Sequence, residues 1–433
     1  MRAGRQTGKY EGDVRAQRGR AGGPVMYERP SEMEPMVPSG SHADLTALAH
    51  RTARESAALG AMLHPITRQA VVELLRVMNS YYSNLIEGHA THPLDIERAL
   101  RSDFSEEPAT RALQLESKAH VEVQRLIEAR QESEPGLDVC AAPFLQWIHH
   151  EFYQRMPAEF RELRHQDTVE LVVPGALRAR EVVVGRHLPP KAATLESFLT
   201  WFSEAYSPKR LSGLAAIAAA PSAHHRLAWI HPFLDGNGRV TRLFTDAYLR
   251  RVGVDAHGLW TVSRGLARRR DQYLAALAEA DEPRRGDLDG SGRGNLSESS
   301  LVRFGQFFFE VALDQIQFMV DLLDLEGLER RVLAYVAREA SIGKLRPEGA
   351  FLVRDVMLRG EVPRGEAPRI TGTRERTARG IVAHLLAKGL LRSASHRAGL
   401  RWGLPLEALG YYFPRLYPEG VEFMTAFPRA AIE

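Results

Sequence analysis

Twelve consecutive residues, His231 to Arg242, combine side chains that suit phosphoryl or nucleotidyl transfer. They read His-Pro-Phe-Leu-Asp-Gly-Asn-Gly-Arg-Val-Thr-Arg. Gly236, Asn237 and Gly238 permit a tight turn with positive φ that directs successive backbone N–H groups toward one point. A helix over 239–249 would aim its N-terminus at the same point, so the pattern predicts a cradle for an anion such as phosphate.

Charged and titratable residues flank this expected cradle. Arg239 and Arg242 are three residues apart, on one face of the first helical turn, and can both reach the same anion. Asp235 supplies a carboxylate suited to hold Mg²⁺ against phosphate oxygens. A neutral imidazole at His231 can take a proton from an incoming hydroxyl. The spacing therefore predicts transfer of a phosphoryl or nucleotidyl group.

The twelve residues resemble the HPFx[D/E]GNGRxxR signature of Fic domains and match it at every specified position. Fic proteins commonly transfer AMP from ATP to a Ser, Thr or Tyr hydroxyl of a target protein. The resemblance implies that His231 is the general base, that Asp235 holds Mg²⁺ and that Arg242 reaches the γ-phosphate. The α- and β-phosphates of ATP would be held by Gly236, Asn237 and Gly238, with help from Arg239. Transfer of another nucleotide or of phosphocholine stays open.

A second stretch, from Ser83 to Gly88, fits the family's inhibitory motif (S/T)xxxE(G/N). In proteins with this motif the glutamate pairs with the second arginine of the signature, so the resemblance implies a salt bridge between Glu87 and Arg242. That pair would keep ATP from binding productively, and we expect a self-inhibited transferase. In some relatives the same glutamate aligns a water that removes AMP from the target, and this activity stays open. Gly88 is also an ordinary C-cap, the alternative without function.

Two further stretches agree with the resemblance. Residues 168–190 are expected to form a short β-hairpin that resembles the Fic flap. A target segment would dock there, around 174–185, by adding a strand, although a hairpin that only covers the core fits the sequence equally well. Residues 269–277 resemble the segment beside the adenine, so Tyr273 is expected at the nucleotide.

Helical periodicity dominates the chain and predicts a mainly α fold. Pro221 is expected to end the apolar run that precedes it, so that the helix leading into the loop covers 223–230. Near the C-terminus, three helices and an extended stretch over 391–402 predict a winged helix-turn-helix. We expect four parts: a disordered basic extension at 1–42, a helical region with the inhibitory motif at 43–130, a Fic helical core with its hairpin flap at 131–325, and the winged-helix domain with a C-terminal tail at 326–433.

Composition excludes other classes of protein. The net charge of +3 over 433 residues is too small for the whole chain to bind nucleic acid. Cys140 is the single cysteine, which excludes an internal disulfide and a cysteine-based zinc site. The longest apolar run, around 211–220, falls short of the ~20 residues that span a bilayer, and no signal peptide is recognised. We therefore expect a cytoplasmic protein without a membrane partner.

The C-terminal part carries clustered cations that favour a second function. They lie on the expected recognition helix and in the expected wing: Arg374, Arg376, Arg379, Arg392, Arg397 and Arg401. Such a surface is typical of duplex binding, although winged helices also dock proteins. The alternative to the enzyme is thus a DNA-binding regulator whose Fic core is a sensor or dormant. Because a dormant site has no need of an intact signature, we favour the enzyme, and family analogy implies a homodimer.

Overall fold

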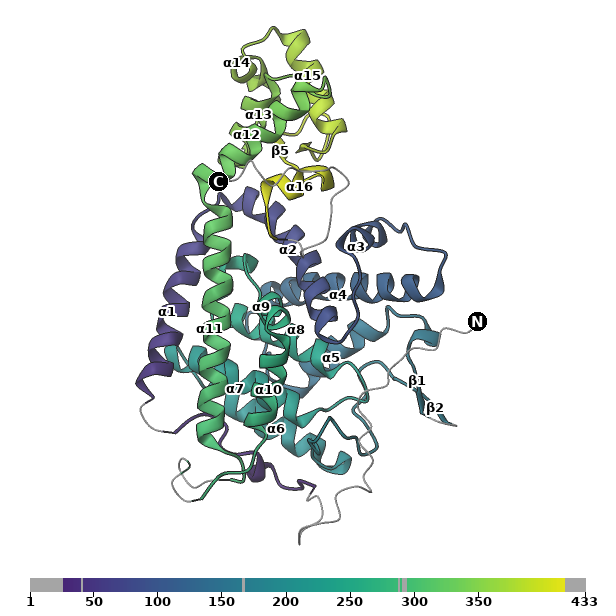
Figure 1. Ribbon diagram of the computed structural model, residues 1–433, viewed down its shortest axis with the longest axis vertical. Coiled ribbons are helices and arrows are strands. Elements are labelled where there is room, and N and C mark those ends of the chain that lie inside the picture. The colour runs from purple at the N-terminus through teal and green to yellow at the C-terminus, as the bar shows by residue number, and fades with distance from the viewer. Residues whose placement is uncertain (1–25, 40–41, 166–167, 287–288, 290–293, 417–433) are drawn as a thin grey trace. The chain divides into compact units, whose positions relative to one another are not determined.

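The computed structural model describes residues 26–39, 42–165, 168–286, 289 and 294–416 (Figure 1). The first 25 residues of the predicted basic extension and the tail after residue 416 lie outside the described residues. Among the described helices, none combines the length and the apolarity needed to cross a membrane. Cα packing divides the chain into two units: residues up to Ala57 with Asn79–Thr91 and Asp95–Ile316, and Ala58–Met78 with His92–Leu94 and the residues from Gln317.

The first unit is built from helices and one small hairpin. Its complete helices are α4 (Pro108–Ser133), α5 (Ala142–Tyr153), α6 (Leu195–Tyr206), α7 (Leu214–Ile230), α8 (Asn237–Arg251), α9 (Val262–Arg268) and α10 (Arg270–Ala280), and it holds all but the first two residues of α3 (Pro93–Leu100). It also holds most of α1 (Ala43–Gly60) and of α11 (Glu298–Leu323), and the last turns of α2 (Pro65–Ile86). The mainly α fold is therefore confirmed.

Helix α7 is the centre of this unit. Nearly all of its residues are buried, and α6 and α8 pack against it (Figure 1). Its buried residues include the polar ones at 224–226 as well as apolar ones, so α7 lies in the core, and it leads directly into the loop that begins at His231. The prediction that Pro221 precedes this helix is wrong, because α7 starts at Leu214 and runs through the proline. Packing on every side outweighs the roughly 3 kcal/mol that an internal proline costs a helix.

The hairpin exists, but at a different place in the sequence. Strands β1 (Glu162–His165) and β2 (Thr168–Leu171) pair antiparallel, with Glu162 opposite Leu171. The prediction of a hairpin over 168–190 is therefore wrong in position, since residues 174–190 hold only an isolated bridge between Val184 and His187. The alternation that suggested the first strand is real and continues past β2, but its partner lies before it in the chain.

The predicted disorder is wrong for residues 26–39, which fold onto the first unit. A 3-10 turn, Pro30–Met33, packs against α6, and Met33 is fully buried. The guanidinium of Arg226, itself buried in α7, donates to the carbonyl of Pro35 at 2.8 Å. The glycine and proline content of the basic extension predicted disorder. In the structure two methionines of this segment are buried in the core, and its backbone carbonyls accept hydrogen bonds from buried side chains such as Arg226.

The second unit combines helices with a three-stranded antiparallel sheet. Helices α12 (Leu325–Ser341), α13 (Gly349–Arg359) and α16 (Leu406–Tyr412) pack together, while α14 (Ala367–Thr371) leads through a turn into α15 (Glu375–Ala387). Gly372 makes that turn with a φ of +62°. Strands β3 (Glu361–Val362), β5 (Leu400–Trp402) and β4 (Leu391–Arg392) follow in this spatial order. Buried Val362 and Leu391 face this unit's core.

We predict that Met33→Ala lowers the free energy of unfolding by about 2–4 kcal/mol, because it empties a fully buried site. Val37→Ala is the matched control in the same segment, since Val37 is 40% exposed, and should change stability by at most about 0.5 kcal/mol. Urea denaturation of the two variants measures both. Equal and small effects would show that residues 26–39 do not pack as described.

Candidate active site

The conformation of the loop from His231 to α8 depends on the side-chain amide of Asn237 and on Gly236. His231 caps the end of α7 in the left-handed conformation, with a φ of +49°, and Gly236 caps the start of α8 with a φ of +80°. The Asn237 side chain accepts from the N–H of Phe233 at 2.9 Å and donates to its carbonyl at 2.8 Å. Asn237 therefore fixes the loop itself, whereas the family resemblance places its side chain on phosphate.

The two glycines of the loop lie where no Cβ fits. A Cβ on Gly236 would come within 2.7 Å of the Tyr153 ring. A Cβ on Gly238 would collide with the carboxylate of Glu87. The Glu87 carboxylate thus lies over the first turn of α8, at the helix N-terminus where an anion is favoured. The Glu87 carboxylate therefore occupies the place where the sequence predicts a phosphate cradle.

Arg242 holds that carboxylate. Its guanidinium bonds Glu87 Oε1 at 2.6 Å, Ser83 Oγ at 2.9 Å and the Ser83 carbonyl at 2.9 Å. The Arg242 side chain is 2% exposed and that of Glu87 34%. Burial raises the pKa of Glu87, but Arg242 and Arg239 outweigh it and hold the pKa below its usual value. Gly88 follows with a φ of +86°, so the residues that resemble the inhibitory motif also form the end of α2 and the turn after it.

The first signature arginine, Arg239, also pairs with a buried carboxylate. It bonds Glu116 of α4, which is 1% exposed and contacts His89 Nδ1 at 2.9 Å. Arg239 reaches the Tyr153 hydroxyl at 3.1 Å as well. Burial raises the pKa of Glu116, but Arg239 and His89 bring it below its usual value. Both signature arginines are therefore neutralised by ionised glutamates.

Glu116 and Tyr153 are site residues that the sequence analysis missed. Glu116 lies on the apolar face of α4, between buried Ala112 and Val123 at helical spacing. A carboxylate on such a face needs a buried partner of opposite charge. The position of Glu116 in the sequence could therefore have predicted a buried ion pair. Tyr153, at the end of α5, had no comparable signal.

Asp235 presents a partly exposed carboxylate at the edge of the loop. Its side chain is 42% exposed, and its Oδ2 accepts from the Tyr153 hydroxyl at 2.7 Å and from Arg239 at 3.3 Å. Burial raises the pKa of Asp235, but Arg239 and the Tyr153 hydroxyl bring it below its usual value, so it is ionised. No group of three or more metal-ligating side chains occurs in the described part of the chain. A single carboxylate suits Mg²⁺ that arrives with nucleotide phosphates rather than a resident ion.

The imidazole of His231 is in the neutral form that a general base requires. Its Nδ1 lies 3.3 Å from the carbonyl of Ala228, which can only accept, so Nδ1 carries the proton and Nε2 is left with its lone pair. Burial, with a smaller effect of His187, lowers the pKa of His231 to about 4. The Arg178 side chain, completely buried, donates to the His231 carbonyl at 2.9 Å. The loop is thereby fixed at the residue that would handle the proton.

Tyr273 lies on α10 and is buried. Its hydroxyl bonds His224 Nε2 at 2.8 Å, and burial raises its pKa to about 12. The residue is 3% exposed, so Tyr273 lies in the core, and its expected place at a nucleotide stays a prediction.

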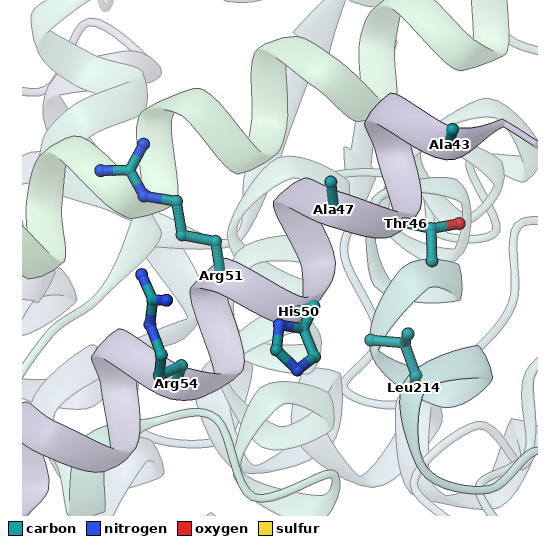
Figure 2. A pocket seen from close by; sticks show the side chains of 7 residues that line it. All are labelled: Ala43, Thr46, Ala47, His50, Arg51, Arg54 and Leu214. Carbon is teal, nitrogen blue, oxygen red and sulfur yellow. The ribbon is translucent and has the colours of Figure 1, made fainter.

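A shallow pocket shares no lining residue with the loop. Figure 2 shows that it is lined mainly by α1, with His50, Arg51 and Arg54 projecting from the helix beside Leu214 of α7. Arg51 and Arg54 approach Glu55 at 2.7 and 3.6 Å, so their charges are partly neutralised. We assign no function to this pocket.

Comparison with known proteins identifies the part of the chain that holds the loop. Residues 141–249 match the model of the Fic/DOC family. The chain carries a Fic domain. Protein adenylyltransferase Fic of Drosophila willistoni is 39% identical over 97 residues, which are 22% of this chain and 18% of the relative. That of Drosophila melanogaster is 38% identical over 93 residues, with the same two shares. The match thus spans less than a fifth of the length of these curated relatives.

Solved structures of Fic proteins resemble the chain more remotely. A Fic family protein of Desulfovibrio desulfuricans is 15% identical, with a TM-score of 0.48 over 84% of this chain and 98% of its own. Fic-1 of C. elegans is 16% identical, with a TM-score of 0.46 over 64% of this chain and 73% of its own. The loop from His231 to Arg242 lies inside the Fic domain, whereas Glu87 and Tyr273 lie outside the matched residues.

We predict that His231 is uncharged at pH 5.5, where an ordinary histidine with a pKa of about 6.5 is mostly protonated. Its folded-state pKa of about 4 lies below that value, so protonation begins only well under pH 5.5. NMR of the imidazole, assigned by comparison with His231→Ala, measures the charge. A titration centred near pH 6.5 would contradict the burial described.

Proposed function

We propose that this chain is a self-inhibited protein adenylyltransferase that moves AMP from ATP to a Ser, Thr or Tyr hydroxyl of a target protein. The observation that carries the proposal is the position of the Glu87 carboxylate, over Gly238 and on Arg242. That position is the anion cradle of the Fic loop. A site that binds a carboxylate there with a buried arginine is chemically suited to bind phosphate.

In the proposed reaction His231 Nε2 accepts the proton of the target hydroxyl. The hydroxyl oxygen then bonds the α-phosphorus of ATP while the bond from that phosphorus to the bridging oxygen breaks, and pyrophosphate leaves with its electrons. A base with a pKa of about 4 is neutral at pH 7 and so available. The N-terminus of α8 and Arg239 stabilise the charge that develops on the phosphate oxygens.

In the proposal Asp235 binds Mg²⁺ together with the phosphates of ATP. The residues fit this role, because the carboxylate is ionised and partly exposed, and Tyr153 and Arg239 already orient its Oδ2. The ion would neutralise phosphate charge as pyrophosphate departs.

Inhibition follows from competition between two anions for Arg242. While Glu87 holds this arginine, the γ-phosphate lacks its cation, and the carboxylate repels the phosphates at the cradle. The same carboxylate is 34% exposed, so in the proposal it can also align a water that removes AMP from a modified target. ATP as donor and the single buried thiol, Cys140, fit a cytoplasmic setting.

For the target, we propose docking as an extended segment at the hairpin and the loop after it, through residues 174–185. Val169, Leu171 and Val173 are all exposed, by 45% or more, and alternate along the chain from β2 onward. Residues at alternate positions of an extended segment share one face, so the hairpin offers an apolar face, and in the described residues its sheet has two strands, to which a target segment could add a third.

We predict that Glu87→Gly raises self-modification with AMP at least about 10-fold, because one charge-assisted contact to phosphate becomes available. Mass spectrometry of the purified variant after incubation with ATP and Mg²⁺ detects the adduct without knowledge of the target. The double variant with His231→Ala should show none. Absence of any adduct on Glu87→Gly, with the variant folded, would contradict the proposal.

A second candidate function, DNA binding, is favoured by the surface of the second unit. Arg374 and Arg376 are exposed at the start of α15, and Arg392 and Arg397 are exposed at the β4–β5 turn. In the described part of the chain none of the four has an ion pair, in contrast to Arg401, which pairs with Glu361. Unpaired cations on a helix after a tight turn and on an adjacent hairpin suit the phosphates of a duplex.

If this surface binds DNA, replacing Arg374 and Arg376 by alanine should make the negative slope of log K against log salt shallower by about two. Gel shifts with a random duplex between about 50 and 200 mM salt measure it. Arg330→Ala with Lys344→Ala removes the same charge from exposed positions of the second unit, and should leave binding unchanged. No shift at 50 mM salt, or an equal loss in both variants, would overturn the second function.

A further inference from the structure

The end of α2, which presents Glu87, is held by side chains as well as by backbone. A helix leaves its last four carbonyls without intrahelical partners. Here the Asn84 carbonyl accepts from the N–H groups of Glu87 and His89 at 3.0 and 2.9 Å, and that of Leu85 accepts from Gly88 at 3.0 Å. The other two, on Ser83 and Ile86, accept from arginine side chains.

The two arginines come from different helices. Arg242 of α8 donates to the Ser83 carbonyl at 2.9 Å, a contact that belongs to the Fic loop. Arg270, the first residue of α10, donates through Nε to the Ile86 carbonyl at 2.8 Å. Arg264 of α9 adds a contact with the Tyr82 ring, with 5.9 Å between guanidinium carbon and ring centre. The last turn of α2 is therefore held from the α9–α10 corner as well as from α8.

The contact of Arg270 bears directly on Glu87. The Ile86 carbonyl and the Glu87 nitrogen belong to one peptide unit, which is planar. A hydrogen bond to that oxygen therefore fixes the plane from which the Glu87 Cα and side chain start. Because the carboxylate must lie over Gly238 and meet Arg242 at 2.6 Å, a change in this plane would move it off both.

We propose that Arg270 is a positioning residue that sets the strength of inhibition: it holds the Ile86–Glu87 peptide so that Glu87 stays on Arg242. This inference rests on the proposed function, since it concerns the regulation of that site. Arg270 also lies on the helix that carries Tyr273, three residues earlier in α10. The helix expected beside the nucleotide and the inhibitory helix are thus joined by one hydrogen bond.

A purely structural role would give different results. A cation at a helix C-terminus also stabilises the helix, and its loss would lower the melting temperature without raising activity. A direct contact of Arg270 with nucleotide would make its loss lower activity in every background. Only a positioning role predicts a gain of activity that needs Glu87.

The test places Arg270→Leu in two backgrounds, the wild-type chain and Glu87→Gly, and measures self-modification with AMP from ATP and Mg²⁺. We expect a rise of about 3- to 10-fold in the wild-type background, the upper end being about 1.4 kcal/mol. In the Glu87→Gly background we expect no change. Arg270→Lys, which keeps a charged donor, should stay within about twofold of the wild type. Arg268→Ala is the matched control: it removes an exposed cation two residues away that makes no hydrogen bond with α2 in the described residues.

Each outcome separates this inference from the proposed function. If Glu87→Gly is active but Arg270→Leu leaves the wild type unchanged, the inference is wrong and the proposed function stands. If Arg270→Leu lowers activity in the Glu87→Gly background, Arg270 acts on the nucleotide and the inference is wrong. If Glu87→Gly itself forms no adduct, the proposed function fails. Arg270→Gln replaces Arg270→Leu if the latter does not fold, and its gain should be smaller because it keeps a neutral donor.

Discussion

The buried guanidinium of Arg242 is the constraint on which the site depends. A charge that is 2% exposed must have a partner, and the chain supplies one in Glu87, which follows α2 and is 155 residues away in the sequence. Three further residues support this ion pair. Ser83 completes the hydrogen bonds of Arg242, and Gly238 leaves room for the Glu87 carboxylate. Arg270 bonds the carbonyl of the peptide that leads into Glu87. Because phosphate can replace a carboxylate on an arginine, the proposed inhibition and the proposed binding of ATP would both depend on Arg242.

A parallel pair shapes the other half of the cradle. Arg239 is bound by Glu116, and through Tyr153 it is linked to Asp235, the expected Mg²⁺ ligand. The residue that follows Gly88, His89, contacts Glu116. The segment after α2 therefore reaches both arginines: Glu87 bonds Arg242 directly, and His89 contacts Glu116, which bonds Arg239. Any movement of α2 away from α8 would act on both halves of the cradle.

The candidate residues of the loop could be predicted from the sequence because they are local: twelve consecutive residues include the histidine, the carboxylate, the glycines and both arginines. The pairing of Glu87 with Arg242 was reached through resemblance, since nothing in their separation indicates contact. Glu116 and Tyr153 were missed because their roles arise only when α4 and α5 pack beside α8. The hairpin was misplaced because alternation identifies a strand but not its partner. Tertiary packing also explains two further differences from the prediction: α7 continues through Pro221, and residues 26–39 are folded although their composition predicted disorder.

The most direct test of the account is a crystal structure of Glu87→Gly with Mg²⁺ and a non-hydrolysable ATP analogue. The account predicts the γ-phosphate on Arg242, the α- and β-phosphates at the N-terminus of α8, and the α-phosphorus within reach of a hydroxyl placed beside His231 Nε2. A nucleotide bound elsewhere, or an Arg242 that keeps a carboxylate partner while the phosphates lie away from it, would contradict the claim that Glu87 occupies the phosphate site.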